Sequence, residues 1–387
     1  MAIASVAARA TVRDFGRFYR EYAKTGTHAA SAAILTGLGL LTTVHPGFAV
    51  IAIVAYVLPP VYLYINSGRR ADSDSGTTSG AAQIGEQTSS TESKTEWIEV
   101  DTPTDNSLFD VVVSSNGPYA VGAEGTVLTR RADGWEHVLE QGPTVRSNTL
   151  RGADVTSDGR HVWLAGDSGV VAKYDTEADK LTDYSAPKDN TSTWEDIAVS
   201  GQAGGEKIFL VTGSGELLRG ATIENNVRWG TTVKPGSGSS MTSVEFVDEE
   251  NGYLCDTNTA VYETTDGGES YERIGIEDAN CEFLDITAVE SGPVMVAGDD
   301  GTVFRYDRDG NNWTKRSVDE HAITAIDSQN HNALASGEHG TIYEYTADGW
   351  EPVSGPILTD ATLHGITFGN NGQDVAVGRD GTIIEQR

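Results

Sequence analysis

From Leu108 to the end of the chain, short apolar runs alternate with polar residues, and the pattern repeats. An apolar–polar alternation with a period of two predicts half-buried β-strands. Each repeat contains a turn motif in which Gly-x-x-Gly is followed by Thr or Val and an apolar residue. The clear copies are VGAEGTV (121–127), AGDSGVV (165–171), AGDDGTV (297–303), SGEHGTI (336–342) and VGRDGTI (377–383), and the weaker ones are VTGSGEL (211–217) and LCDTNTA (254–260).

The spacing of these motifs indicates seven units. The closing positions of successive motifs lie 44, 46, 43, 43, 39 and 41 residues apart. Glycine, or Asn258 in its place, can supply the positive φ that a tight hairpin turn needs. A second series of runs keeps the same period: LFDVVV, LRGADV, WEDIAV, MTSVEF, LDITAV, ITAIDS and LHGITF, beginning at Leu108, Leu150, Trp194, Met241, Leu284, Ile323 and Leu363.

Each unit continues with a third strand, an Asp-Gly turn and a fourth strand led by Trp, as in DGWEHV (133–138). Four short strands in about 40–50 residues are typical of a β-propeller blade. The sequence therefore predicts an all-β, seven-bladed β-propeller over residues 96–387. The seventh unit has only three strands before Arg387, so we predict that EWIEVDTP (96–103) adds the missing fourth strand and closes the last blade.

The N-terminal part has a different pattern. Residues 25–68 carry no formal charge and are interrupted by His45-Pro46-Gly47, which predicts an α-helical transmembrane hairpin over 29–66. A basic amphipathic segment (1–28) precedes the hairpin, and a flexible Ser/Thr-rich linker (67–95) follows it. Basic residues on both sides of a hairpin place the propeller in the cytoplasm, whereas a single span would place it outside.

Charge separates these two parts further. The chain has 27 Lys and Arg against 57 Asp and Glu, a net charge of −30, yet residues 1–70 carry +5 and the remainder −35. A basic N-terminal end suits an anionic membrane surface, while the acidic remainder excludes a general nucleic-acid binder. The acidic composition resembles that of proteins from salt-loving archaea.

A recognisable motif marks the blade ends. TTDGGESY, from Thr264 to Tyr271, resembles an Asp-box, in which the Asp accepts hydrogen bonds from turn amides and the aromatic residue packs between blades. Together with the repeats, it resembles Asp-box (BNR-type) propellers of the photosystem II stability/assembly-factor-like group. That resemblance implies a non-enzymatic platform that binds a protein partner, a subunit of a membrane complex. A cell-surface Asp-box glycan hydrolase or sugar-binding propeller is the alternative.

The connections between second and third strands are expected to form a mostly acidic crown around the channel mouth, where loops on a rigid scaffold bind ligands. No catalytic residue and no cofactor are predicted, and whether the crown holds a cation stays open. Arg151, Arg379, Glu195, Asp285 and His364 could face the channel but lack the sialidase pattern. Cys255 and Cys281 are predicted to lie on the crown face, as a disulfide or as two free thiols. The crown residues are Glu124, Asp167, Asp256, Asp299, Asp300, Glu338, His339, Arg379 and Asp380.

Overall fold

A computed structural model describes residues 96–387, apart from 139–146, 225, 277–278, 291, 309, 347–348, 354–358 and 371. The basic segment, the predicted hairpin and the linker lie outside the described residues. Within the described part, no helix combines the length and the apolar character needed to cross a bilayer.

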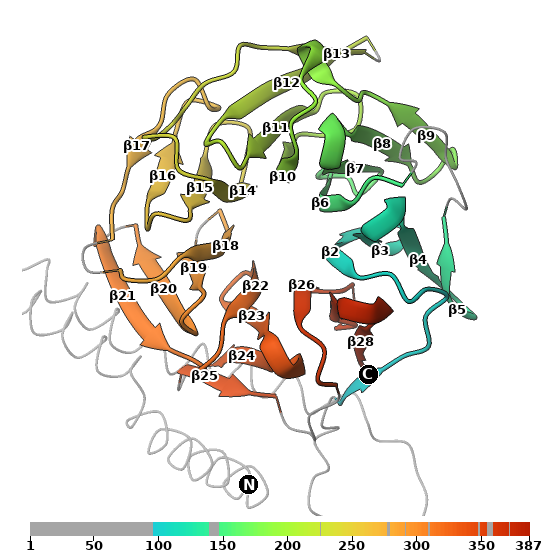
Figure 1. The fold of residues 1–387 in the computed structure, drawn as a ribbon, viewed down its shortest axis with the longest axis vertical. Helices are drawn as coiled ribbons and strands as arrows, with labels where there is room; N and C mark the ends of the chain where they lie inside the picture. The colour runs from blue at the N-terminus through green and yellow to red at the C-terminus, as the bar shows by residue number, and fades with distance from the viewer. Residues whose placement is uncertain are drawn as a thin grey trace, which may run out of the picture. The chain divides into compact units, whose positions relative to one another are not determined.

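Seven four-stranded antiparallel sheets surround a central opening (Figure 1). This arrangement confirms the predicted seven-bladed propeller. Blades 1 to 3 consist of β2 (Leu108–Ser114), β3 (Gly117–Gly122), β4 (Val127–Arg131) and β5 (Gly134–His137); β6 (Leu150–Val155), β7 (His161–Gly166), β8 (Val171–Asp175) and β9 (Lys180–Asp183); and β10 (Trp194–Ser200), β11 (Lys207–Thr212), β12 (Leu217–Ile223) and β13 (Asn226–Trp229).

Blades 4 to 6 follow the same order, with the first strand innermost. They consist of β14 (Met241–Phe246), β15 (Gly252–Asp256), β16 (Val261–Thr264) and β17 (Glu272–Arg273); β18 (Phe283–Ala288), β19 (Val294–Gly298), β20 (Thr302–Asp307) and β21 (Asn312–Ser317); and β22 (Ile323–Gln329), β23 (Asn332–Gly337), β24 (Ile342–Thr346) and β25 (Gly349–Pro352).

The last blade is completed by the N-terminal strand, as predicted. Its order is β1 (Trp97–Glu99), β28 (Ile383–Gln386), β27 (Val375–Gly378) and β26 (Leu363–Thr367). In the antiparallel pairing of β1 with β28, Trp97 lies opposite Gln386 and Glu99 opposite Ile384. The ring is therefore closed by a strand that precedes blade 1 in the sequence.

The core lies between neighbouring blades, because each sheet buries both of its faces against the next. The second strand is the most enclosed: every residue of β7 is buried, and the same holds for β19. The outer strands are more exposed, as in β9 and β21. These positions explain why the second strands have almost continuous apolar sequences, whereas the outer strands are polar.

The turns between second and third strands differ from the prediction in blade 4. Gly125, Gly169 and Gly381 have positive φ, as expected, but in blade 4 the positive φ lies at Thr259 and not at Asn258. The Asp256 carboxylate accepts the amide N–H groups of Asn258 and Ala260, each at 2.9 Å, and thereby holds this turn in another way. The start of blade 5 also shifts by one residue, since Phe283 and not Leu284 pairs with the end of β19.

The Asp-box of blade 4 has the predicted geometry. The Asp266 carboxylate accepts the amide N–H of Ser270 at 2.9 Å and its hydroxyl at 2.6 Å. These two hydrogen bonds lower the pKa of Asp266 to about 2. Tyr271 packs against the apolar cluster that contains Phe209 and Phe246, so its ring lies between blades 3 and 4.

Candidate functional site

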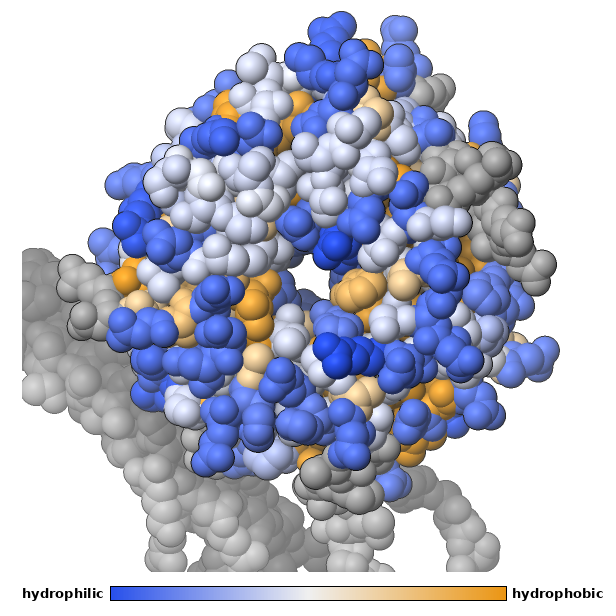
Figure 2. All heavy atoms as spheres, in the orientation of Figure 1, coloured by the Kyte–Doolittle hydropathy of each residue, from blue (hydrophilic) through white to orange (hydrophobic). Residues whose placement is uncertain are grey.

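The seven innermost strands enclose a channel along the axis of the propeller. Its volume is about 440 Å³, and the strands β2, β6, β10, β14, β18, β22 and β26 contribute its lining. Figure 2 shows the opening in the face, surrounded mostly by polar side chains, with apolar side chains bordering it on two sides. Every blade contributes to this channel, so it is our candidate site.

A β-bulge re-aims one side chain of every innermost strand. In all seven blades the register between first and second strands shifts after the first residue of the inner strand, as between Leu108 and Asp110. Bulges occur where a strand must redirect a side chain. The seven bulged residues all line the channel, and we call them the mouth ring: Phe109, Arg151, Glu195, Thr242, Leu284, Thr324 and His364.

The mouth ring is chemically mixed. Phe109 lies against His364, with 5.3 Å between the ring centroids. Burial lowers the pKa of His364, and the nearby charge of Arg379 lowers it further. Arg151 donates from Nε to the Asp167 carboxylate at 2.7 Å and lies 3.6 Å from Glu195. Apolar, cationic and anionic groups thus face the same opening.

Below the mouth ring, carboxyl groups line the channel, and we call them the carboxyl ring. Its members alternate along the blades between the third and the fifth residue of the inner strand, so they form two layers. Blades 1, 3 and 5 supply the first layer and blades 2, 4 and 6 the second. The members are Asp110, Asp196 and Asp285 in the first layer and Asp154, Glu245 and Asp327 in the second.

Five of these carboxyl groups tie neighbouring blades together. Asp110 accepts the N–H of Val111 in its own blade and of Ala153 in the next blade, both at 2.7 Å. Such a carboxylate clamp recurs at Asp154, Asp196, Asp285 and Asp327. Each clamp satisfies a backbone donor of the next inner strand, so these carboxyl groups have a structural role.

Glu245 makes no such clamp. Among the described residues no hydrogen-bond partner of its carboxyl group is found, although its side chain faces the same channel. The additional methylene of Glu, compared with Asp, moves the carboxyl group away from the amides that an Asp reaches at this position.

Burial raises the pKa of the carboxyl ring. The pKa of Asp154 and of Asp196 rises to about 7, and that of Asp327 to about 6, because the narrow channel disfavours the charged form. The pKa of Asp110 and of Asp285 is raised for the same reason. The pKa of Glu245 is raised well above its ordinary value by burial and by the neighbouring carboxylates.

The predicted crown residues lie at the ends of the second strands, on the face that carries the channel mouth. Four of the connections are single 3₁₀ turns: η1 (Ala123–Gly125), η2 (Asp167–Gly169), η4 (Glu338–Gly340) and η5 (Arg379–Gly381). The exposed crown residues are Glu124, His339, Arg379 and Asp380 in these turns and Asp299 and Asp300 in the connection between β19 and β20. They are spread around the face, and within the described residues no group of His, Cys, Asp and Glu could hold a metal ion.

Four crown residues are held by hydrogen bonds to their carboxylates, and one of them is Asp300, which accepts the N–H of Thr302 at 3.1 Å. Asp256 is only 1% exposed, and its carboxylate holds the turn of blade 4. Asp167 is paired with Arg151, and Asp299 accepts the N–H of Glu282 at 2.9 Å. Of the five residues considered for a sialidase-like site, all but Arg379 line the channel.

The two cysteines are free and buried. Of the two predicted alternatives, a disulfide or two free thiols, the structure has the free thiols. Both lie in one apolar cluster with Phe283 and Phe304. The Cys255 thiol lies 3.2 Å from the Thr242 hydroxyl, and burial raises its pKa. Burial also raises the pKa of Cys281 to about 12, so neither thiol is activated as a nucleophile.

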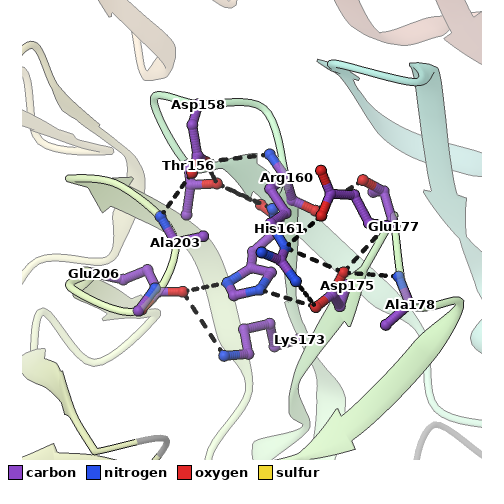
Figure 3. Close-up of polar contacts among 12 residues, drawn as sticks. Thr156, Asp158, Arg160, His161, Lys173, Asp175, Glu177, Ala178, Ala203 and Glu206 are labelled. Carbon is purple, nitrogen blue, oxygen red and sulfur yellow. Dashed lines mark hydrogen bonds and ion pairs between the residues drawn. The ribbon is translucent and has the colours of Figure 1, made fainter.

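A buried polar network between blades 2 and 3 resembles catalytic machinery but is structural. Figure 3 shows the His161 ring between two carboxylates, with Glu206 2.5 Å from Nδ1 and Asp175 3.4 Å from Nε2. Lys173 approaches the same Glu206 at 3.7 Å. Both ring nitrogens face carboxylate oxygens and Glu206 is fully buried, so this network joins the blades and offers no free base.

The sequence analysis named Arg151, Glu195, Asp285 and His364 as residues that could face the channel, but it did not identify the mouth ring or the carboxyl ring as complete sets. A signal for the carboxyl ring was present, since six of the seven innermost strands contain an acidic residue at the third or fifth position. No such signal marks the mouth ring, because a bulge depends on the register between two strands.

The architecture and the Asp-box define the chain as a seven-bladed, BNR-type β-propeller. More particularly, residues 221–386 match the family model of the photosynthesis system II assembly factor YCF48. The match runs from the third blade to the last strand of the seventh. No curated protein is a significant match.

Solved structures share the fold at low sequence identity. YCF48 from Cyanidioschyzon merolae is 17% identical with a TM-score of 0.59, over 75% of this chain and 98% of that chain. A structure of YCF48 bound to a D1 peptide is 14% identical with a TM-score of 0.59, over 76% and 94% of the two chains. Virginiamycin B lyase from Staphylococcus aureus is 15% identical with a TM-score of 0.62, over 76% and 99%. At these identities the likeness shows the fold alone, which here carries both a binding protein and an enzyme.

Proposed function

We propose that this chain is a membrane-anchored, non-catalytic platform that binds an exposed segment of a membrane-complex subunit during assembly. The family match carries this proposal, because the YCF48 family consists of assembly factors. A further support is that one YCF48 structure is a complex with a D1 peptide. The particular partner of this chain has its own sequence, and nothing in the chain ties it to photosynthesis.

The mouth ring is the surface that we assign to the partner. Phe109 and Leu284 are half-buried apolar side chains on nearly opposite parts of the ring, and polar groups stand between them. Binding energy at protein interfaces concentrates in a few such anchors surrounded by polar residues. Because the bulges fix these side chains on a rigid scaffold, the surface needs little ordering when a peptide binds.

Anchoring rests on the predicted hairpin at 29–66. The linker at 67–95 would let the propeller reach subunits near the membrane. We place the chain in the cell membrane, with the propeller in the cytoplasm by the positive-inside rule. Protease treatment of intact cells tests the side, because an outside propeller would be degraded.

Quantitative co-purification tests the platform. The full-length chain, recovered from membranes in mild detergent, is compared with the double variant Phe109→Ala/Leu284→Ala and with Ile223→Ala. Ile223 is 44% exposed at the end of β12, outside the channel, and is the matched apolar control. We expect one membrane subunit to be enriched equally by the parent chain and the control, and at least about tenfold less by the double variant.

Equal recovery by all three chains would remove the mouth ring from the proposal, and recovery of this chain alone would contradict the platform itself. Circular dichroism of each variant verifies that the propeller is intact.

The alternative, a glycan hydrolase or a sugar-binding propeller, requires arginines that converge on a substrate carboxylate. Among the described residues that line the channel, Arg151 is the only arginine, and it is already paired with Asp167. Hydrolysis of a fluorogenic sialoside by the purified chain would favour the alternative.

A further inference from the structure

One hydroxyl group in the channel lies between two carboxyl groups. Ser243 Oγ is 2.9 Å from Oδ2 of Asp196 and 2.8 Å from Oδ1 of Asp285. The three residues come from the three consecutive blades 3, 4 and 5. A serine hydroxyl has a single proton to donate.

The geometry of this cluster requires a second proton. If both carboxyl groups were ionised, the hydroxyl proton could satisfy one contact, and the other would place two unprotonated oxygens less than 3 Å apart. Neither carboxyl group can turn away, because each also accepts two backbone N–H groups in its clamp. A proton on one carboxyl group turns both contacts into hydrogen bonds.

Glu245 adds a second acidic group to the same strand. It follows Ser243 by two residues in β14, so both side chains point into the channel. No described residue donates a hydrogen bond to it, and it lies in the field of Asp154, Asp327, Asp196 and Asp285. An ionised Glu245 would therefore face like charges without compensation.

The groups that face this cluster come from every innermost strand. The acidic ones are Asp110, Asp154, Glu195 and Asp327, and the remaining members are Arg151 and His364. Arg151 is engaged by Asp167 and Glu195 in the mouth ring, so the carboxyl ring has no cation of its own among the described lining residues.

We propose that the channel is a pH-sensitive device: one proton shared by Asp196 and Asp285 through Ser243, and a second on Glu245, hold blades 3, 4 and 5 together, and loss of these protons loosens that part of the ring. The device acts within the propeller and does not depend on the proposed partner.

The direction of the pH dependence follows from the raised pKa values. In the native chain the pKa of Asp196 is about 7, against an ordinary value of 3.8, and that of Glu245 is also raised. At a pH between the ordinary pKa and the raised native pKa, the native state binds protons that the unfolded state has released. The stabilisation is fully present below the ordinary pKa and is lost as the pH rises through the native pKa.

Infrared spectroscopy tests the protons directly. The full-length chain in ²H₂O at pH 6 should show the C=O stretching band of neutral carboxylic acids, and the band should fade by pH 9. In Ser243→Ala the band should shift, because the acid has lost its hydrogen-bond acceptor. A native chain without such a band at pH 6 would overturn the proposal, whether or not any variant folds.

The pH profile of unfolding tests the consequence. Each proton held only by the native state makes the unfolding constant rise up to about tenfold per pH unit. Glu245→Gln should therefore flatten the profile above pH 4.5, the ordinary pKa of Glu, by up to that factor, whereas Glu124→Gln, an exposed glutamate at the crown, should leave it unchanged. Parallel profiles for the parent chain and Glu245→Gln would contradict the role of Glu245.

Discussion

Trp97 is the residue through which the N-terminal strand closes the propeller, and its truncation should open the ring at one seam. Its indole is only 3% exposed and packs into a cluster with Leu363, Ile366 and Ile384 of blade 7 and with residues of blade 6. A tryptophan buries about 150–250 Å². At about 25 cal/mol per Å² this area corresponds to about 4–6 kcal/mol of transfer free energy.

The measured loss should be somewhat smaller than this transfer free energy. The indole N–H of Trp97 is buried without a partner among the described residues, so Trp97→Ala also removes an unsatisfied donor worth about 1–3 kcal/mol. The backbone pairing of β1 with β28 can persist. We therefore expect Trp97→Ala to lower the free energy of unfolding by about 3 kcal/mol.

Two readouts locate this effect. Denaturant titration followed by circular dichroism gives the loss of stability, with Trp97→Phe expected to cost less than about 1.5 kcal/mol and Ile223→Ala less than about 0.5 kcal/mol. Hydrogen exchange followed by mass spectrometry should show faster exchange in β28 and unchanged exchange in β14. If Trp97→Ala unfolds at the parent's denaturant concentration, or if exchange rises equally in every blade, β1 does not close the ring.

Two further predictions concern the same blade. Glu385 is buried and accepts hydrogen bonds from Arg130 at 2.6 Å and Trp135 at 2.9 Å. Burial opposes its charge, but the hydrogen bonds from Arg387 and Arg130 outweigh it and lower its pKa below 4.5. Ionised Glu385 should therefore stabilise the folded state above pH 4.5, and this stabilisation should be lost as the pH falls through the lowered pKa. Glu385→Gln should then make the free energy of unfolding depend less steeply on pH in that acid range. A profile as steep as the parent's would refute this. Gly381 and Gly372 have φ of +70° and +74°, but a Cβ at Gly381 would lie 1.9 Å from the Thr104 carbonyl oxygen, whereas at Gly372 nothing lies within 4 Å. Gly372→Ala should cost about 1 kcal/mol in a denaturant titration and Gly381→Ala clearly more, and equal losses would contradict the close approach.

The architecture was predictable because it depends on patterns that repeat. Seven copies of one turn motif and seven apolar runs determine the number of blades, and the likeness of EWIEVDTP to the other fourth strands predicts the closure. The errors are single-residue shifts, at Thr259 instead of Asn258 in blade 4 and at Phe283 instead of Leu284 in blade 5. There the turn or the strand start is held by side-chain hydrogen bonds or by a bulge, and neither follows from apolar spacing.

The candidate site was less predictable, because it depends on which way a side chain turns. Asp256 has the sequence of an exposed turn residue, yet its carboxylate is buried beneath the turn that it holds. Conversely, Asp154 and Asp327 occupy polar positions of alternating strands, which in isolation predict exposure to bulk water. The ring directs them into a narrow channel, where they clamp adjacent blades.

The seams between neighbouring blades are not all held by the same interactions, and the carboxyl ring supplies the hydrogen bonds across most of them. Clamps from Asp110, Asp154, Asp196, Asp285 and Asp327 span five seams. The seam between blades 7 and 1 is instead joined through Glu385, which accepts hydrogen bonds from Arg130 and Trp135.

Among the residues that the structure describes, the seam between blades 4 and 5 alone has neither device, because Glu245 stands where the other even-numbered blades have a clamping Asp. That seam depends on the Ser243–Asp285 contact and on an apolar cluster that includes Tyr253, Phe283 and Phe304. Apolar packing is insensitive to pH, whereas Ser243 can hydrogen-bond to Asp196 and Asp285 at once only when one of these carboxyl groups is protonated. The seam without a clamp is thus also the seam at which protonation can regulate the ring.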